Sequence, residues 1–174
     1  MTLTPDSELR LAFDPSILTK DLTKNLPSGL HARPLSSNDH SRGHLKVLSN
    51  LTKAPQVPDQ EWEQRFESIT SLSGVYYPIA LIDVETDSIA ALGSLIVEMK
   101  FLRGLGKVGH IEDIVVSSNH QGRGLGKVLI QILTSLSESL GCYKTILDCS
   151  PDNQAFYEKC GYKLAGVEMA KYTC

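Results

Sequence analysis

The sequence predicts an α/β domain in which helices flank a mixed central sheet. Three observations lead to this class. Strand-like and helix-like runs follow one another in the order strand, two helices, three strands, helix, strand, helix and strand. The helix-like run that ends near residue 140 carries a wide apolar stripe, which needs the face of a sheet to cover it. A glycine-rich turn joins that helix to the strand before it, so the helix is expected to cross between parallel strands.

Length and composition are those of a single globular domain. The chain has 174 residues, of which 41% are hydrophobic and 21% charged, and this is long enough to bury a core. The formal net charge of −3 gives no general reason to expect a nucleic acid or an anionic membrane as a partner. No apolar run reaches the roughly 18 residues that a membrane span needs. The first residues also lack a basic stretch followed by an apolar one, so we expect no secretory signal and a cytoplasmic protein.

The cysteines give no sign of a metal site. They are Cys142, Cys149, Cys160 and Cys174. None belongs to a Cys-x-x-Cys pair, so a zinc site has no support and we expect no bound metal. Two of them fall in segments predicted to be core, which favours free, buried thiols and a reducing compartment.

Residues 1–28 are predicted to be an N-terminal extension of a domain that spans residues 29–174. Within the extension, Asp14 precedes Pro15, the pattern of a helix cap followed by proline at the first helical position. We expect the extension to pack on the domain or to be loosely attached to it. The sequence assigns it no function.

Apolar periodicity and turn residues divide the first half of the domain into a strand, two helices and a hairpin. Trp62 and Phe66 recur at helical spacing after Asp59, which predicts a helix capped by Asp59 with both rings in the core. Runs rich in β-branched and aromatic residues on either side of a polar turn predict an antiparallel hairpin. The predicted elements are a strand at 30–35, helices at 39–52 and from 59 onward, and strands at 75–84 and 89–99.

The second half is predicted to hold the glycine-rich turn and the long helix, followed by a strand, a helix and a strand. Gly141 is expected to end the long helix in the left-handed conformation. The predicted elements are a loop at 100–109, a strand at 110–116, helices at 127–140 and 154–159, a strand at 143–149 between them, and a last strand at 161–169.

The turn between the predicted strand and the long helix has the chemistry of an anion site. Backbone N–H groups are exposed there at the positive end of a helix dipole, where phosphates commonly bind. A Walker A loop is excluded because Val128 stands where that motif needs serine or threonine. A dinucleotide fingerprint is excluded because Lys127 or Leu129 would stand at its third glycine. The remaining pattern is Gln-x-x-Gly-x-Gly, formed by Gln121, Gly124 and Gly126. The alternative is a plain turn that uses glycine for its positive φ.

This pattern resembles the pyrophosphate loop of the GNAT superfamily of acyl-CoA N-acyltransferases. Five further segments can be compared, at residues 110–114, 141–144, 146–149, 156–162 and 166–169. Together they are similar to eukaryotic glucosamine 6-phosphate N-acetyltransferases. The resemblance covers about residues 29–170 and implies the GNAT fold, acetyl-CoA as co-substrate, glucosamine 6-phosphate as acceptor on the route to UDP-N-acetylglucosamine, a homodimer, and no metal.

The resemblance also implies which residues bind the two substrates. The backbone of a strand would hold the pantetheine, and the glycine-rich loop would hold the pyrophosphate. The donor-binding residues are Ile114, Val115, Val116, Gln121, Gly122, Arg123, Gly124, Leu125 and Gly126. The acceptor-binding residues are Ser49, Lys100, Arg103, Glu112, Asp113, Tyr143, Lys144 and Asp148. In one departure, Tyr172 stands where the family often has an arginine for the sugar phosphate, and Lys171 lies beside it.

Acetyl transfer to an amine needs a proton acceptor and a group that stabilises the leaving thiolate. Glu112 and Asp148 are the candidate proton acceptors, and Asp148 could instead orient the amine through its backbone carbonyl. We expect Glu112 rather than Asp113 to face the sugar, since adjacent strand residues point to opposite faces. Tyr157 is the candidate for the leaving group, because its phenol can hydrogen-bond the developing thiolate.

Several alternatives stay open from the sequence. Covalent catalysis by Cys149 is disfavoured, since a lone strand cysteine is more often a small buried hydrophobe. His110 is left out of the site as a structural strand histidine. The rival functions are an acetyltransferase for another small amine or a peptide, and a non-catalytic module that binds acetyl-CoA.

Overall fold

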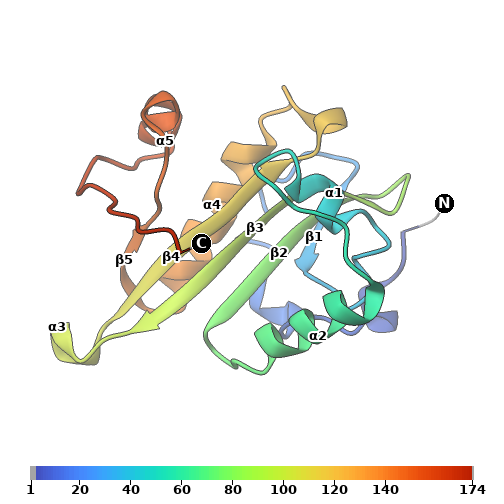
Figure 1. Cartoon of the computed structure of the whole chain (residues 1–174), viewed down its shortest axis with the longest axis horizontal. Helices are drawn as coiled ribbons and strands as arrows, with labels where there is room; N and C mark the ends of the chain where they lie inside the picture. The colour runs from blue at the N-terminus through green and yellow to red at the C-terminus, as the bar shows by residue number, and fades with distance from the viewer. Residues whose placement is uncertain (1–2, 174) are drawn as a thin grey trace.

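A computed structural model describes residues 3–173, and its five strands form one sheet (Figure 1). The strand order is β1-β2-β3-β4-β5. The first four strands pair antiparallel, whereas β5 joins β4 in parallel after the crossover through α4. The predicted mixed α/β class is therefore confirmed. The strands are β1 (Leu30–Pro34), β2 (Tyr76–Asp83), β3 (Ser88–Met99), β4 (Lys107–Val116) and β5 (Cys142–Ile146).

Helices cover both faces of this sheet. On one face the apolar stripe of α4 packs against the strands together with side chains from the N-terminal extension. On the other face Trp62 and Phe66 of α2 lie in a second core with Val47 of α1, as predicted for the two aromatic rings. The α-helices are α1 (His44–Leu48), α2 (Asp59–Thr70), α3 (Leu102–Leu105), α4 (Leu125–Ser139) and α5 (Gln154–Glu158). The 3-10 turns are η1 (Asp6–Glu8), η2 (Pro15–Ile17), η3 (Ser118–His120) and η4 (Pro151–Asn153).

The N-terminal extension is packed on the domain and is not loosely attached. The ring of Phe13 lies edge-on to Tyr77 of β2 with centroids 5.1 Å apart. Arg10 reaches Glu63 and Glu67 on α2 at 2.8 and 3.1 Å. The Asp14 side chain accepts a hydrogen bond from Ser16 N–H, so the predicted cap is present at a 3-10 turn.

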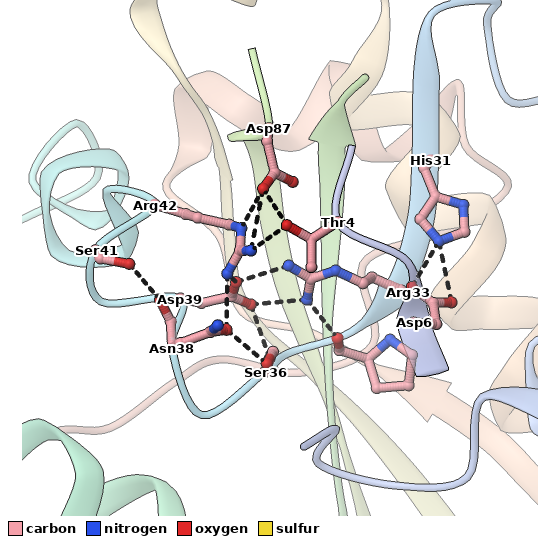
Figure 2. A network of polar contacts seen from close by, with 11 residues as sticks. Thr4, Asp6, His31, Arg33, Ser36, Asn38, Asp39, Ser41, Arg42 and Asp87 are labelled. Atoms are coloured by element: carbon pink, nitrogen blue, oxygen red, sulfur yellow. Dashed lines mark hydrogen bonds and ion pairs between the residues drawn. The ribbon is translucent and has the colours of Figure 1, made fainter. Parts of the chain in front are cut away.

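A buried network of ion pairs fixes the chain between β1 and α1 (Figure 2). Arg33 donates to both carboxylate oxygens of Asp39, at 2.8 and 2.7 Å, and neither side chain is exposed to solvent. Arg42 continues the network to Asp87 in the β2–β3 turn and to Thr4 of the extension. This network holds residues 39–43 in turns, so α1 begins at His44 and the helix predicted from residue 39 is shorter than expected.

Three further predictions are wrong in detail. Asp59 is the first residue of α2 and makes no capping hydrogen bond; Pro58 holds the cap position. Residues 161–169 form no strand, because they run outside the sheet with most of their surface exposed. Of the cysteines that the structure describes, Cys149 is exposed and Cys142 and Cys160 are half-buried, so none is a buried core thiol. Cys174 lies outside the described residues.

Candidate active site

The glycine-rich loop leads from β4 through η3 into the first turn of α4, as predicted, although the helix begins at Leu125 and not at Lys127. Gly122 and Gly124 have φ of 77° and 75°, a left-handed conformation that glycine adopts without strain. Gly124 occupies the N-cap position with no side-chain cap. The N–H groups of the first turn therefore have no helical acceptor and are available to an anion. The loop therefore has the geometry of an anion-binding helix start.

The parallel strands β4 and β5 separate beyond the middle of β4. Their pairing runs from Lys107 opposite Cys142 to His110 opposite Ile146, where β5 ends (Figure 1). Residues 111–116 of β4 therefore have no partner strand on the β5 side within the described residues. The three predicted pantetheine-binding residues, Ile114, Val115 and Val116, all lie in this stretch, directly before the glycine-rich loop.

A β-bulge lies next to the two predicted carboxylates. Ser94 pairs with Glu112 and Leu92 pairs with Val115, so one residue of β3 opposes two of β4. Asp113 takes a φ of 57°, and it lines the same cavity of about 110 Å³ as Ser94. Because residues that pair directly share a face, Glu112 lies on the side of Ser94. The expectation that Glu112 and Asp113 point to opposite faces is therefore wrong: the bulge interrupts the alternation.

The pKa values of the Glu112 and Asp113 carboxyl groups are both raised. Partial burial raises the pKa of Glu112, and the neighbouring charges of Asp113 and Asp148 raise it further, while His110 acts in the opposite direction. Partial desolvation also raises the pKa of Asp113, although the residue as a whole is exposed. A carboxylate with a raised pKa is a better proton acceptor near neutral pH than an ordinary one. The structure thus brings Asp113 and Asp148 within electrostatic reach of Glu112.

Tyr157 and Asp148 line one open cleft of about 430 Å³, between the β5 end, α5 and the C-terminal segment. Lys144 and Cys149 line it as well. Burial raises the pKa of the Tyr157 phenol, so the hydroxyl keeps its proton at neutral pH and can donate a hydrogen bond. Tyr157, predicted to stabilise the leaving thiolate, and Asp148, predicted to contact the sugar amine, therefore line the same cleft.

The basic residues predicted for the sugar phosphate separate into two groups. The guanidinium of Arg103 lies 5.7 Å and the ammonium of Lys144 6.0 Å from the centre of the Tyr143 ring, so these three predicted residues gather where α3 meets β5. Lys100 instead contacts the carboxylate of Glu98. Both groups lie on the hairpin of β3 and β4 or on β5, which is the strand next to β4 (Figure 1).

Three candidate residues lie apart from this cluster. Ser49 caps the C-terminus of α1 and lines a different, polar cavity of about 660 Å³ with Ser117 to His120. Lys171 and Tyr172, considered for the missing arginine, are exposed in the C-terminal segment and line neither cavity.

One pair of side chains beside the site was missed from the sequence. The Nε2–H group of His110 on β4 donates to Glu98 on β3 at 3.0 Å. His110 shares the face of Glu112 because the two residues are two positions apart on a strand. The period-two spacing of His110 and Glu112 was the available signal. The contact with Glu98 depends on the register of two strands, which the sequence alone does not specify.

Within residues 3–173, no helix is long and apolar enough to cross a membrane. In the same residues, no group of three or more histidine, cysteine or acidic side chains is arranged to hold a metal ion.

The fold and the loop agree with comparisons to known proteins. The profile of the acetyltransferase (GNAT) family matches residues 46–162, which run from α1 through the glycine-rich loop and α5. The chain therefore belongs to the GNAT acetyltransferases, which is the class that the separated strands and the anion-binding helix start define.

The nearer relatives narrow this class. A protein of Arabidopsis thaliana named glucosamine 6-phosphate N-acetyltransferase is 46% identical over 141 residues, which are 80% of this chain and 94% of that one. A Dictyostelium discoideum protein of the same name is 44% identical and covers 83% of this chain and 91% of its own. The crystal structure of the A. thaliana protein matches with a TM-score of 0.79 at 42% identity, over 82% and 97% of the two chains. This chain is a member of the glucosamine 6-phosphate N-acetyltransferase family.

Proposed function

We propose that this chain transfers the acetyl group of acetyl-CoA to the amine of glucosamine 6-phosphate by direct attack in a ternary complex. The product, N-acetylglucosamine 6-phosphate, would serve UDP-N-acetylglucosamine synthesis. The observation that carries the proposal is the junction of an unpaired strand edge at residues 111–116 with an anion-binding helix start, beside three carboxylates. The similarity to enzymes named for this reaction supports the choice of acceptor.

On the donor side, the proposed contacts come from the backbone. The N–H groups of Gln121 to Gly126 bind the pyrophosphate, and the exposed edge of Ile114 to Val116 pairs with the amides of the pantetheine, as another strand would. Acetyl-CoA, when bound, supplies an activated acetyl thioester. The strand edge then orients the thioester carbonyl for attack, and holding two reactants in line supplies several kcal/mol.

On the acceptor side, Glu112 is proposed to take the proton of the sugar amine. Its raised pKa suits it to this step better than an ordinary carboxylate. Asp148 is proposed to orient the amine, through its carboxylate or its backbone carbonyl, and Asp113 is proposed to hold a sugar hydroxyl. Ser49 lines a separate cavity and is given no role at this site. Arg103 and Lys144, which lie over the ring of Tyr143, are proposed to hold the phosphate, which calls for cationic partners. Lys100 is paired with Glu98 instead.

At the leaving group, Tyr157 is proposed to donate its phenolic hydrogen to the thiolate as the C–S bond breaks. Burial keeps the hydroxyl protonated until then. A phenol with a pKa above that of a thiol gives up a full proton only at a cost, but a hydrogen bond to the developing charge is favourable.

A homodimer is proposed from two exposed apolar surfaces. The tip of the β3–β4 hairpin projects beyond the sheet and exposes Phe101, Leu102 and Leu105 by 95%, 72% and 72% (Figure 1). The C-terminal segment exposes Leu164, Val167, Met169 and Tyr172. Surfaces of this kind typically pack against another molecule. Sedimentation of the purified chain would test this: a mass of one chain at micromolar concentration contradicts the dimer.

The test of the function is a thiol-release assay over a panel of amines. Glucosamine 6-phosphate should be acetylated with the highest kcat/KM, and unphosphorylated glucosamine should be far poorer because it lacks the anion that the basic cluster holds. Equal or better turnover of glucosamine, a polyamine or a peptide N-terminus would favour the other-amine alternative. Tight acetyl-CoA binding without transfer to any amine would favour the non-catalytic module.

A further inference from the structure

Glu98 and His110 form a carboxylate–histidine pair on the face of the sheet that carries Glu112. The Nε2 atom of His110 lies 3.0 Å from Oε2 of Glu98, and the other oxygen of Glu98 contacts the ammonium of Lys100. Lys100 fixes the carboxylate from one side and the ring is held from the other. A carboxylate beside one ring nitrogen selects the tautomer that has its hydrogen on that nitrogen. The lone pair of the neutral ring then lies on Nδ1, where it can accept a proton.

The register of the strands places this pair beside Glu112. Ile96 pairs with His110 and Ser94 pairs with Glu112, so His110 and Glu112 are successive residues on one face of β4. The charge of His110 lowers the pKa of Glu112, which agrees with this proximity. The groups that face Glu112 are Asp113 from the bulge, Asp148 from the end of β5, Glu168 from the C-terminal segment, Tyr76 from β2 and His110 itself. His110 in turn faces Glu98 and, through it, Lys100.

We propose that the Glu98–His110 pair removes the amine's proton from Glu112 and delivers it to water. This inference rests on the proposed acetyl transfer and adds an exit path for the proton. The ammonium nitrogen loses one proton to the carboxylate of Glu112, and Nδ1 of His110 takes that proton, directly or through one water. The imidazolium, stabilised by Glu98, then releases it to solvent. No electrons are exchanged, and Glu112 returns to its carboxylate form for the next turnover.

The exposure of the pair suits this role. The side chain of His110 is 31% exposed and that of Glu98 is 43% exposed, so both reach bulk water while part of each stays buried. Glu112, by contrast, is crowded by three other carboxylates, and a proton that it takes up would be held there. An imidazole has two ring nitrogens, so a histidine that donates through one of them can accept a proton at the other.

The experiment compares His110→Gln and Glu98→Gln with wild type across pH. Glutamine at 110 can still donate an N–H to Glu98 but cannot carry a proton. We expect kcat at saturating substrates to fall about 10- to 100-fold below neutral pH, at the low end of acid–base effects because water can bypass part of the relay. The loss should shrink at high pH, where the sugar amine arrives neutral and needs no base. Glu98→Gln should lower kcat in the same pH-dependent way, by a smaller factor.

Two further measurements separate proton transfer from structure. Imidazole added to His110→Ala should restore kcat in a concentration-dependent manner, which a packing role would not allow. The matched control is His31→Gln, because His31 forms a similar pair with Asp6 at 2.9 Å and 35% exposure but lies on β1, away from the site. This control should leave kcat and its pH profile unchanged.

The outcomes are distinct for the two proposals. A wild-type protein that fails to acetylate glucosamine 6-phosphate overturns the proposed function before any variant is made. An active wild type whose His110→Gln variant keeps its kcat, or loses the same factor at every pH without rescue by imidazole, overturns the relay alone. A pH-dependent loss with imidazole rescue supports it.

Discussion

Replacement of Asp39 by alanine should cost about 3–5 kcal/mol of unfolding free energy, because it leaves a buried charge without its partner. Arg33 and Asp39 have side chains with no exposed surface, and two hydrogen bonds of 2.8 and 2.7 Å join them (Figure 2). The backbone N–H of Ser36 also donates to Asp39, at 2.7 Å, and would lose its acceptor. Only one contact of the guanidinium would remain, the hydrogen bond to the Pro34 carbonyl.

The loss of unfolding free energy is measurable by urea denaturation monitored with circular dichroism, and the slope of the transition is compared between variants. A loss of that size corresponds to a fall in Tm of about 6–20 °C for a domain of this length. The double variant Arg33→Met/Asp39→Leu removes both charges and should be more stable than Asp39→Ala, since replacing a buried pair by apolar residues is far less costly than breaking it.

The matched control is Asp21→Ala. Asp21 pairs with Lys24 at 3.0 Å, but their side chains are 82% and 64% exposed, so the change should cost less than about 1 kcal/mol. If Asp39→Ala were as mild as Asp21→Ala, the pair could not be the buried, water-excluded contact that fixes the chain before α1.

The remaining predictions concern the site. Tyr157→Phe should lower kcat about 10- to 100-fold while the KM for acetyl-CoA changes by less than about twofold, in a thiol-release assay; unchanged kcat removes Tyr157 from the mechanism. Gly124→Val should weaken CoA binding at least about tenfold by calorimetry, because valine is strained at a φ of 75° and crowds the anion; full affinity in a folded variant contradicts the loop assignment. Glu112→Gln should stabilise the fold at pH 8 relative to wild type but not at pH 4. The pKa of Glu112 is raised on folding, so the native state binds more protons and wild-type stability falls as pH rises through that window. A Tm difference that is the same at both pH values contradicts the raised pKa.

The strand, turn and helix around the donor site were predictable because each is determined by local sequence. The spacing of glycines after an apolar strand and before an apolar stripe predicts an anion-binding helix start, and the loop has that geometry. Gly141, predicted to end the helix, has a φ of 80°. Trp62 and Phe66, placed in the core by helical spacing alone, are 6% and 3% exposed.

The errors come from contacts between distant parts of the chain. The ion pairs of Arg33 and Arg42 with Asp39 and Asp87 replace the first turns of the predicted helix before His44. The C-terminal residues 161–169 alternate as a strand does, but a strand forms only beside another strand, and within the described residues none offers them pairing. The Glu98–His110 contact needs the register of β3 on β4, which no local pattern contains.

The bulge at Asp113 connects the core to the chemistry of the site. On β3 the bulge is opposed by Gly93, where a Cβ atom would lie 2.5 Å from Cδ1 of Ile114 and 2.9 Å from Cδ1 of Leu133. The absence of a side chain at Gly93 leaves room for Ile114 to pack against α4, so β4 can hold one residue more than β3. That extra residue turns Asp113 towards the side of Glu112, whose pKa is raised first by burial and then by the charge of Asp113. Because of this extra residue, side chains again alternate between the two faces of the sheet from Ile114 onward, where the proposed donor-binding edge begins. A buried glycine within β3 therefore gives room for both the acidic pair and the register of the strand edge, and a larger residue there should disturb the proposed acceptor and donor sites together.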